Sequence, residues 1–223
     1  SMLKLLIHSG EALVAKASPQ LDWQTIHSSN RLRMQIQGFH QVGISGGGKT
    51  VVFLGKHLHT IDGNNCSKTV GDNEIKNRLF SAVDQSTLRE FVNTIEGRFL
   101  VLSIDLNEDV AVCSDRFGKV DVYFQSIYGG VTVATDLGLL PGNLASEGYD
   151  QSALAHTLTY YGYRPPKRHT IYNAVRRLGV RDLLAIKNGS CQVEKNLLIL
   201  NESRQFNDRE HGNYKRSFLE YLE

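Results

Sequence analysis

Hydrophobic residues occur in short runs along the whole chain, and the spacing within each run predicts a strand or a helix. Residues 2–8 form an apolar run typical of a strand. Residues 36–56 predict two strands joined by a glycine-rich turn at residues 46–48, with Val51 to Leu54 in the second strand. Residues 9–35 are mixed and weakly patterned. The first part of the chain therefore predicts three strands.

Two amphipathic helices are expected next. The first begins at Asp72 and places its apolar side chains on one face, namely Ile75, Leu79, Ala82 and Val83. The second has Thr87 and Glu90 at capping-box spacing, and Gly97 stands where the residue after a helix end belongs. Its apolar side chains also follow at helical spacing, namely Leu88, Phe91, Val92 and Ile95.

After Gly97 the hydrophobic period changes to two, which is typical of strands. Alternating segments cover residues 99–105, 110–114, 122–128 and 131–135. Polar or glycine-containing turns separate them at residues 106–109, 115–119 and 129–130. This order predicts an antiparallel meander of four consecutive strands.

The remaining elements are a helix, a hairpin and a polar segment. Asp150 is expected to cap a helix with Leu154, Leu158 and Tyr161 on one face, ended by Gly162 and Pro165-Pro166. A hairpin is expected from residues 183–186 through Asn188-Gly189 to residues 193–200. Residues 201–213 are polar and typical of a linker, and residues 214–223 begin an amphipathic helix.

Composition and charge exclude several classes of protein. The chain has 223 residues, of which 41% are hydrophobic and 22% charged, as in ordinary globular proteins. The net charge of +2 is too low for a nucleic-acid footprint, and the basic stretch at residues 164–181 is explained as a solvated face or a subunit contact. No apolar run approaches the ~20 residues of a membrane helix, and residues 1–7 are too short for a signal peptide.

The three cysteines, Cys66, Cys113 and Cys191, have no paired spacing. An odd number without C-x-x-C argues against a disulfide framework and against a cysteine-based zinc site. We therefore expect a protein of the reducing cytoplasm.

One segment matches the phosphate-binding P-loop pattern. Gly43 to Thr50 reads G-x-x-x-x-G-K-T, in which Lys49 would contact phosphates and Thr50 a magnesium ion. That chemistry needs a helix directly after Thr50, but Val51 to Leu54 is typical of a strand. A glycine-rich hairpin turn is the favoured interpretation, and a P-loop nucleotide-binding module remains an alternative.

Other candidate groups are less specific. His57 and His59 have H-x-H spacing, which on a strand would place both rings on one face as half of a metal site. No carboxylate cluster completes such a site, so a surface or partly buried pair is favoured. Ser9 and Ser114 offer hydroxyls without the G-x-S-x-G pattern of a nucleophile elbow.

The segment Asp115-Arg116-Phe117-Gly118-Lys119 is the most distinctive in the chain. Asp115 can accept backbone N–H bonds within the turn, Arg116 can reach a carboxylate, and Gly118 permits tight backbone geometry. We expect this segment to be a structural corner between two strands.

The stretch from Gly97 to Asp105, followed by Asp115 to Phe124, resembles the glutaminase domain of the asparagine synthetase family, a class II glutamine amidotransferase. Segments 133–140, 154–178 and 183–189 resemble further family motifs in the same order. The resemblance covers roughly residues 75–200, and residues 1–70 match the family poorly.

This resemblance implies a fold and a chemistry. The implied fold is α+β, an Ntn-hydrolase-like αββα sandwich of two antiparallel sheets flanked by helices. In the family an N-terminal cysteine attacks the glutamine amide, its own α-amino group acts as the base, and ammonia passes to a C-terminal ATP-using domain. Residues 2–200 would be the glutaminase-like domain, 201–213 a linker, and 214–223 the start of a helix in a missing synthetase domain.

The sequence departs from the family where the chemistry takes place. No Met-Cys-Gly start is present. Ser1 is the one catalytic candidate, because a hydroxyl beside a free amine can act in the same way, although Ser1-Met2 is also typical of a cleaved tag. Of the family's oxyanion-hole segment only Gly55 is kept, and Asp72 and Glu74 are weak counterparts of its acidic pair.

The resemblance therefore predicts an inactive glutaminase-like domain, as in the related β-lactam synthetases and lasso-peptide cyclases. It would be a scaffold for the synthetase domain of an ATP-dependent amide ligase, and the resemblance also allows a homodimer. No cofactor is expected for this chain, and ATP and Mg²⁺ would bind only the missing domain, because the S-G-G-x-D-S loop is absent. The second alternative is an active amidohydrolase with Ser1 as nucleophile, supplying ammonia for asparagine synthesis.

Overall fold

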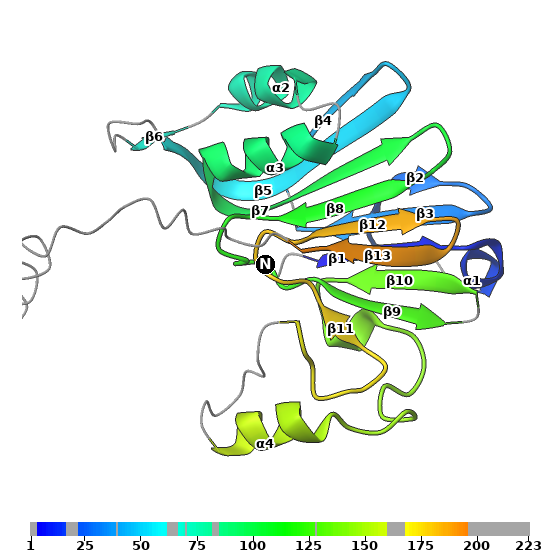
Figure 1. The fold of residues 1–223 in the computed structure, drawn as a ribbon. Coiled ribbons are helices and arrows are strands. Elements are labelled where there is room, and N and C mark those ends of the chain that lie inside the picture. The colour runs from blue at the N-terminus through cyan, green and yellow to red at the C-terminus, as the bar shows by residue number, and fades with distance from the viewer. Residues whose placement is uncertain are drawn as a thin grey trace, which may run out of the picture.

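The computed structural model describes residues 4–16, 22–38, 40–61, 67–69, 71–81, 85–127, 129–159 and 168–195. These residues form two antiparallel sheets packed face to face, with helices beyond both outer faces (Figure 1). The architecture is mixed α+β, as the sequence predicted. The linker at 201–213, the helix at 214–223, Ser1 and Cys66 lie outside the described residues.

The first sheet, called sheet A here, has six described strands in the order β11-β9-β10-β1-β3-β2. The bounds are β1 Lys4–Ser9, β2 Gln24–Ser28, β3 Leu32–Gln37, β9 Tyr123–Ile127, β10 Gly130–Ala134 and β11 Arg176–Arg177. The predicted first strand is confirmed as β1, in the middle of sheet A. The weakly patterned residues 9–35 contribute β2, the start of β3 and the short helix α1 (Glu11–Lys16).

The second sheet, sheet B, has the order β13-β12-β8-β7-β5-β4 in the described chain, and β6 pairs with β5. The bounds are β4 His40–Gly46, β5 Lys49–Ile61, β6 Ser67–Thr69, β7 Ile95–Asp105, β8 Val110–Ser114, β12 Leu183–Lys187 and β13 Ser190–Glu194. The predicted hairpin is confirmed as β4 and β5, with the turn at Gly47 and Gly48, but its first strand was predicted to begin too early, because residues 36 and 37 belong to β3 of sheet A.

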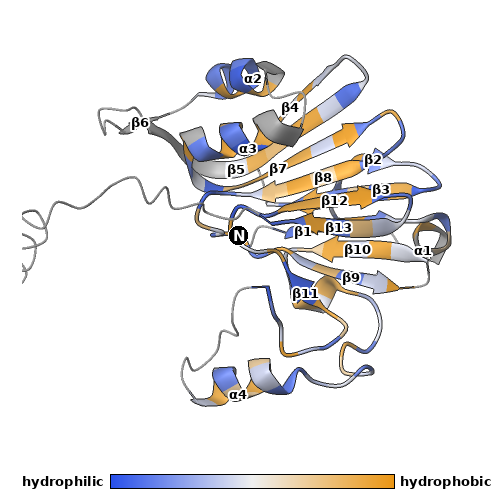
Figure 2. Cartoon of the chain, viewed as in Figure 1, coloured by the Kyte–Doolittle hydropathy of each residue, from blue (hydrophilic) through white to orange (hydrophobic). Residues whose placement is uncertain are grey.

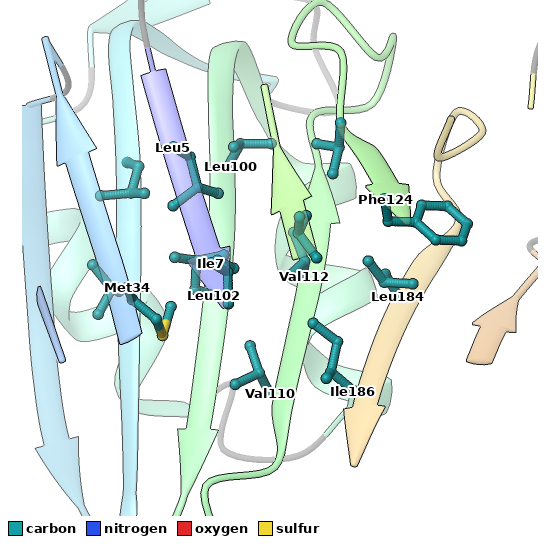
Figure 3. Packing of buried hydrophobic residues seen from close by; sticks show 14 of the residues in the cluster. Leu5, Ile7, Met34, Leu100, Leu102, Val110, Val112, Phe124, Leu184 and Ile186 are labelled. Carbon is teal, nitrogen blue, oxygen red and sulfur yellow. The ribbon is translucent and has the colours of Figure 1, made fainter. Parts of the chain in front are cut away.

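The core lies between the two sheets and follows from the period of two along each strand. In β7, Leu100 and Leu102 belong to the inter-sheet cluster, whereas Phe99 and Val101 belong to a cluster on the other face. Strand β1 contributes Leu5 and Ile7 to the same inter-sheet cluster (Figure 3). Figure 2 shows the hydrophobic residues concentrated on the strands and hydrophilic stretches on α2. Sheet B is buried on both faces, which explains its nearly continuous apolar strands.

Helices α2 (Asp72–Ser81) and α3 (Gln85–Thr94) cover the outer face of sheet B. Both predicted helices are present, and they pack on β4, β5, β7 and β8 through Ile75, Leu79, Leu88, Phe91 and Val92. Ala82 and Val83, predicted on the apolar face of the first helix, lie outside the described residues. The predicted boundaries of the second helix were wrong. Thr87 already lies inside α3, and Gly97 lies inside β7, because the chain enters the sheet at Ile95, opposite Thr60 of β5.

The 3₁₀ turn Leu137–Leu139 packs on the outer face of sheet A with Leu6 and Ala134, and helix α4 (Gln151–Thr159) lies beyond the β11 side of that sheet (Figure 1). Asp150 caps α4 as predicted, since its Oδ1 accepts the Ala153 N–H at 3.0 Å. The predicted apolar face of α4 is not buried, because Leu158 is 75% exposed and Ala153 is the buried residue. Tyr161, Gly162 and Pro165-Pro166 lie outside the described residues.

The predicted meander of four strands was wrong. Strands β7 and β8 lie in sheet B, whereas β9 and β10 lie in sheet A, so the chain crosses between the sheets over residues 115–122. Strand β8 pairs on its second side with β12 instead of β9. Alternation within a strand fixes its two faces but not its neighbours, so the pattern could not separate these two arrangements.

The last predicted hairpin is present as β12 and β13, joined at Asn188-Gly189. Strand β13 covers Ser190–Glu194, so it begins earlier than predicted, and residues 196–200 of the predicted strand lie outside the described residues. In the described part of the chain, no helix combines the length and the apolar character needed to cross a membrane.

Candidate functional site

A cavity of about 350 Å³ opens at the end of the sandwich where β1 ends and α1 begins, near the α1 label in Figure 1. Five turns of the described chain meet there: those after β1, β2, β7, β9 and β12. They come from both sheets. The lining residues are Ser9, Gly10, Glu11, Ala12, Arg31, Asn107, Glu108, Gly129, Asn188 and Gly189.

Glycines allow these turns to approach backbone to backbone. A Cβ on Gly10 would lie 2.8 Å from the Gly130 Cα, and a Cβ on Gly189 would lie 2.7 Å from the Gly129 carbonyl oxygen. Both glycines have positive φ, +113° and +72°. Asn188 also has a positive φ of 48°, so Asn188-Gly189 has the backbone of a type I′ hairpin turn. The wall of the cavity at these glycines therefore consists of backbone, with no side chains to fill the space.

A hydrogen-bonded network fixes the Glu108 carboxylate at the cavity. Its Oε1 accepts a hydrogen bond from His27 Nε2 at 3.0 Å, which ties the edge of sheet A to the β7–β8 turn. The hydrogen bond from the Ser29 hydroxyl contributes most to lowering the pKa of Glu108, with further contributions from His27 and Arg31. Glu108 therefore stays ionised around neutral pH.

Arg31 is held from both ends. Its backbone N–H donates to Ser29 Oγ at 3.0 Å, and its carbonyl accepts the Gly10 N–H at 2.8 Å. Its Nη2 donates to the side-chain oxygen of Asn188, so the guanidinium links a turn of sheet A to a turn of sheet B. The cavity thus presents one fixed cation beside fixed and exposed carboxylates.

Three of these turns were predicted from the sequence, but a binding site at this position was not. The signals were the Asn188-Gly189 pair, the polar turn at 106–109 and the glycines at 129–130. Their convergence depends on which strands pair across two sheets, which no local pattern specifies.

Gly55, predicted as a weak substrate contact, has a packing role in the structure. It is buried in β5, and a Cβ there would lie 2.6 Å from Phe99 Cβ and 2.7 Å from Phe53 Cε1. The two rings pack 4.9 Å apart between their centroids. A glycine is required because the aromatic layer under α3 occupies the space of a side chain.

Replacing Gly55 with alanine is expected to lower the free energy of unfolding by about 1–3 kcal/mol through overpacking. Gly43→Ala is the matched control in the neighbouring strand, because its Cβ would lie 3.8 Å from the Val51 carbonyl oxygen, an ordinary contact. That control is expected to stay within about 0.5 kcal/mol of the parent chain. Urea unfolding followed by circular dichroism measures both, and equal stability of the two variants would contradict the packing role.

Asp72 and Glu74 lie on α2, outside sheet B, and not at the cavity. Asp72 is exposed at the first residue of the helix. Glu74 forms an i,i+4 ion pair with Arg78 at 2.7 Å. The structure does not bring these two residues together with Gly55 in one pocket, and Ser1 lies outside the described residues.

The P-loop alternative is contradicted by the structure. Thr50 is the second residue of β5 and pairs with Ser45, and Lys49 pairs with Gly46 across the hairpin. Residues 50–55 continue as a strand paired with β7, so no helix N-terminus faces this turn. The β-branched run after Thr50 decides for a strand over a helix.

His57 and His59 both lie in β5, but the β5–β7 register shifts between Lys56 and His59. Such a bulge interrupts the strict alternation on which the prediction of a shared face depended. Among the described residues, no group of three His, Cys, Asp or Glu side chains is placed to hold a metal ion.

The predicted corner at Asp115 is confirmed. Its carboxylate is 1% exposed and accepts backbone N–H bonds from Phe117, Lys119 and Val120 at 3.0, 2.8 and 3.3 Å. Gly118 has a φ of +62° within this turn. Burial raises the pKa of Asp115 against the opposing effect of these hydrogen bonds. The turn carries the chain from sheet B to sheet A.

Arg116 behaves differently from its prediction. Its guanidinium carbon lies 5.5 Å from the centre of the exposed Phe117 ring. Its Nε is buried without a hydrogen-bond partner in the part of the chain that the structure describes. The predicted ion pair with a carboxylate is not seen there.

The buried thiol of Cys113 and the two hydroxyls named from the sequence, Ser9 and Ser114, are poorly suited to act as nucleophiles. Burial raises the pKa of the Cys113 thiol to about 12, so the thiol stays protonated. Ser114 is buried in β8, and Ser9 is buried at the rim of the cavity.

No family model matches the sequence, and a search of curated proteins also found no match.

Proposed function

We propose that this chain is a catalytically inactive, glutaminase-like domain of an asparagine-synthetase-like, ATP-dependent amide ligase in the cytoplasm. In this proposal it has the Ntn-hydrolase-like αββα fold and acts as a scaffold for a C-terminal synthetase domain. ATP and Mg²⁺ would bind that second domain and not this chain.

Two features support the proposed fold. The layers run from α2 and α3 through sheet B to sheet A, whose outer face carries the 3₁₀ turn Leu137–Leu139, and this order suits an αββα sandwich (Figure 1). The segment on which the resemblance depends most, residues 97–124, forms β7, β8, the Asp115 corner and the first part of β9. The resemblance motifs therefore coincide with the scaffold of the fold.

The observation that carries the proposed loss of activity is the placement of the substrate-contact candidates. Gly55 is packed beneath two phenylalanine rings, and Glu74 is paired with Arg78 on an outer helix. These positions fulfil structural roles and share no pocket. A domain that keeps its layers while its substrate positions serve packing is best explained as a scaffold.

Ammonia release from L-glutamine by the purified chain tests the proposal. We expect no release above a buffer blank, with a known glutaminase as positive control and intact mass used to identify the first residue. The Ser1→Ala variant is expected to give the same trace as the parent chain. Turnover that disappears in Ser1→Ala would overturn the proposal in favour of a serine-dependent amidohydrolase, and turnover that persists would require another nucleophile.

A further inference from the structure

We propose that the cavity where the five turns meet binds a small zwitterion, a molecule with one ammonium and one carboxylate group, of the free α-amino acid class. Gly55, Asp72 and Glu74, the described candidates for glutamine contacts, do not line the cavity, so this inference does not depend on the proposed function.

The size and construction of the cavity suit a small molecule. Its volume of about 350 Å³ is at the lower end of the range for small-molecule sites. Turns held at the end of a two-sheet scaffold are a common location for binding residues, because the sheets keep them in place. The backbone contacts among Gly10, Gly129 and Gly189 fix three of these turns against one another.

The charged side chains that line the cavity indicate which class of ligand it can bind. The lining carries one guanidinium, of Arg31, and two carboxylates, of Glu11 and Glu108. A dianion such as phosphate would meet two like charges, and a dication would meet the guanidinium. A zwitterion gives each of its charged groups an opposite partner, because Arg31 binds carboxylates well and the glutamates bind ammonium groups.

The charged groups are already in position without a ligand. Arg31 is held by Asn188, and Glu108 is held by His27 and Ser29. A guanidinium has five N–H donors, and the bond to Asn188 uses one of them. Ligand binding would therefore require little reordering of the cationic and anionic partners.

The uncharged part of the lining completes the match. Ser9, Asn107 and Asn188 offer neutral hydrogen-bonding groups. Ala12 and the glycines leave room for a short side chain, and a Cβ on Gly129 would point into open space. This composition favours a compact polar amino acid over a long or strongly apolar ligand.

Isothermal titration calorimetry of the full chain tests the inference with glycine, L-serine, L-aspartate and L-lysine as probes. At up to about 10 mM, we expect saturable binding of glycine or L-serine, and none of acetate, methylammonium or inorganic phosphate, which lack one of the two charges. Arg31→Gln is expected to weaken the binding at least tenfold.

Ala12→Trp is the blocking variant, because Ala12 is exposed on the short helix α1 and lines the cavity. We expect it to abolish binding, whereas Ala155→Trp, at an exposed site on α4 and away from the cavity, leaves binding unchanged. Thermal unfolding of each variant verifies that it is folded. The inference is overturned if no amino acid binds, if phosphate or acetate binds equally well, or if folded Ala12→Trp still binds the zwitterion.

Discussion

Replacing Arg168 with alanine is expected to destabilise the protein more than any other single side-chain truncation considered, by about 3 kcal/mol or more. Arg168 forms a two-pronged ion pair with Asp182, with Nε to Oδ2 at 2.6 Å and Nη2 to Oδ1 at 2.9 Å. The Asp182 side chain is 0% exposed, whereas the Arg168 side chain is 40% exposed. Removing the arginine takes a strong partner away from a carboxylate that water cannot reach.

Because Asp182 is buried and Arg168 is partly exposed, the two residues are expected to differ in the cost of their replacement. Asp182→Asn is expected to cost less than Arg168→Ala, because the exposed guanidinium can be hydrated when its partner loses charge. The double variant is therefore expected to be more stable than Arg168→Ala alone, since it also removes the buried negative charge of Asp182 that has lost its arginine partner. A double-mutant cycle by urea unfolding measures these differences.

Arg176→Ala is the control for this cycle. Arg176 lies on the same basic stretch but is exposed, so its replacement is expected to change stability by no more than about 0.5 kcal/mol. A loss for Arg168→Ala no larger than that of the control would contradict the importance of the ion pair.

The second large effect is a loss of stability in mild acid caused by His8. The imidazole is 6% exposed on the central strand of sheet A, and its Nδ1 lies 3.1 Å from Thr132 Oγ1. Burial, with a smaller contribution from the charge of Arg33, lowers the pKa of His8 from 6.5 to about 4. The folded protein therefore keeps this histidine neutral where the unfolded chain protonates it.

The sign and the pH window follow from these two values. Well above pH 6.5 neither state binds the proton and the effect is absent, and at pH 6.5 the unfolded chain is half protonated at this histidine. As the pH falls from 6.5 toward 4, His8 binds a proton in the unfolded state but not in the folded state, so the free energy of unfolding falls with the pH. The expected loss is about 2 kcal/mol by pH 5 and about 3 kcal/mol by pH 4.

Urea unfolding from pH 7 to pH 4 measures this loss, with His8→Asn as the matched variant. Asparagine keeps a polar atom near the position of Nδ1 and does not titrate, so its stability is expected to lack the step. Glu108 and Asp150 have lowered pKa values and lose their contributions only as the pH falls below about 4.5. His8→Asn shares every other titrating group with the parent chain, including Asp115 with its raised pKa, so the difference between the two proteins isolates the histidine. Equal slopes for the two proteins above pH 5 would refute the assignment.

Local pattern was sufficient for the elements whose signals come from neighbours in the chain. Alternation fixed the strands at residues 99–105 and 110–114, and helical spacing fixed α2 and α3. The Asp115 corner was also predictable, because an aspartate that accepts nearby backbone N–H groups needs only the residues directly after it. The strand after Thr50 followed from its β-branched run, which excluded the P-loop.

The predictions failed where the outcome depends on distant partners. Strands β8 and β9 were predicted from their hydrophobic residues, but β8 pairs with β12, a strand about 70 residues further along the chain. Leu158 has the spacing of a buried residue and is exposed, because α4 buries Ala153 instead. Gly97 was predicted to follow the end of a helix, but its segment pairs with β5 and therefore belongs to sheet B.

The sequence by itself determined most of the strands, the two helices over sheet B, the hairpin turns and the polar corner at Asp115, since each depends on contacts within a few residues. It did not reveal β2, β6, β11 or α1. Only the tertiary structure decided how the strands divide between two sheets, and that division brings Arg31, Glu108 and Asn188 to one cavity. The physical reason is that a period of two assigns faces to a strand, whereas pairing order is set by packing between segments far apart in the chain.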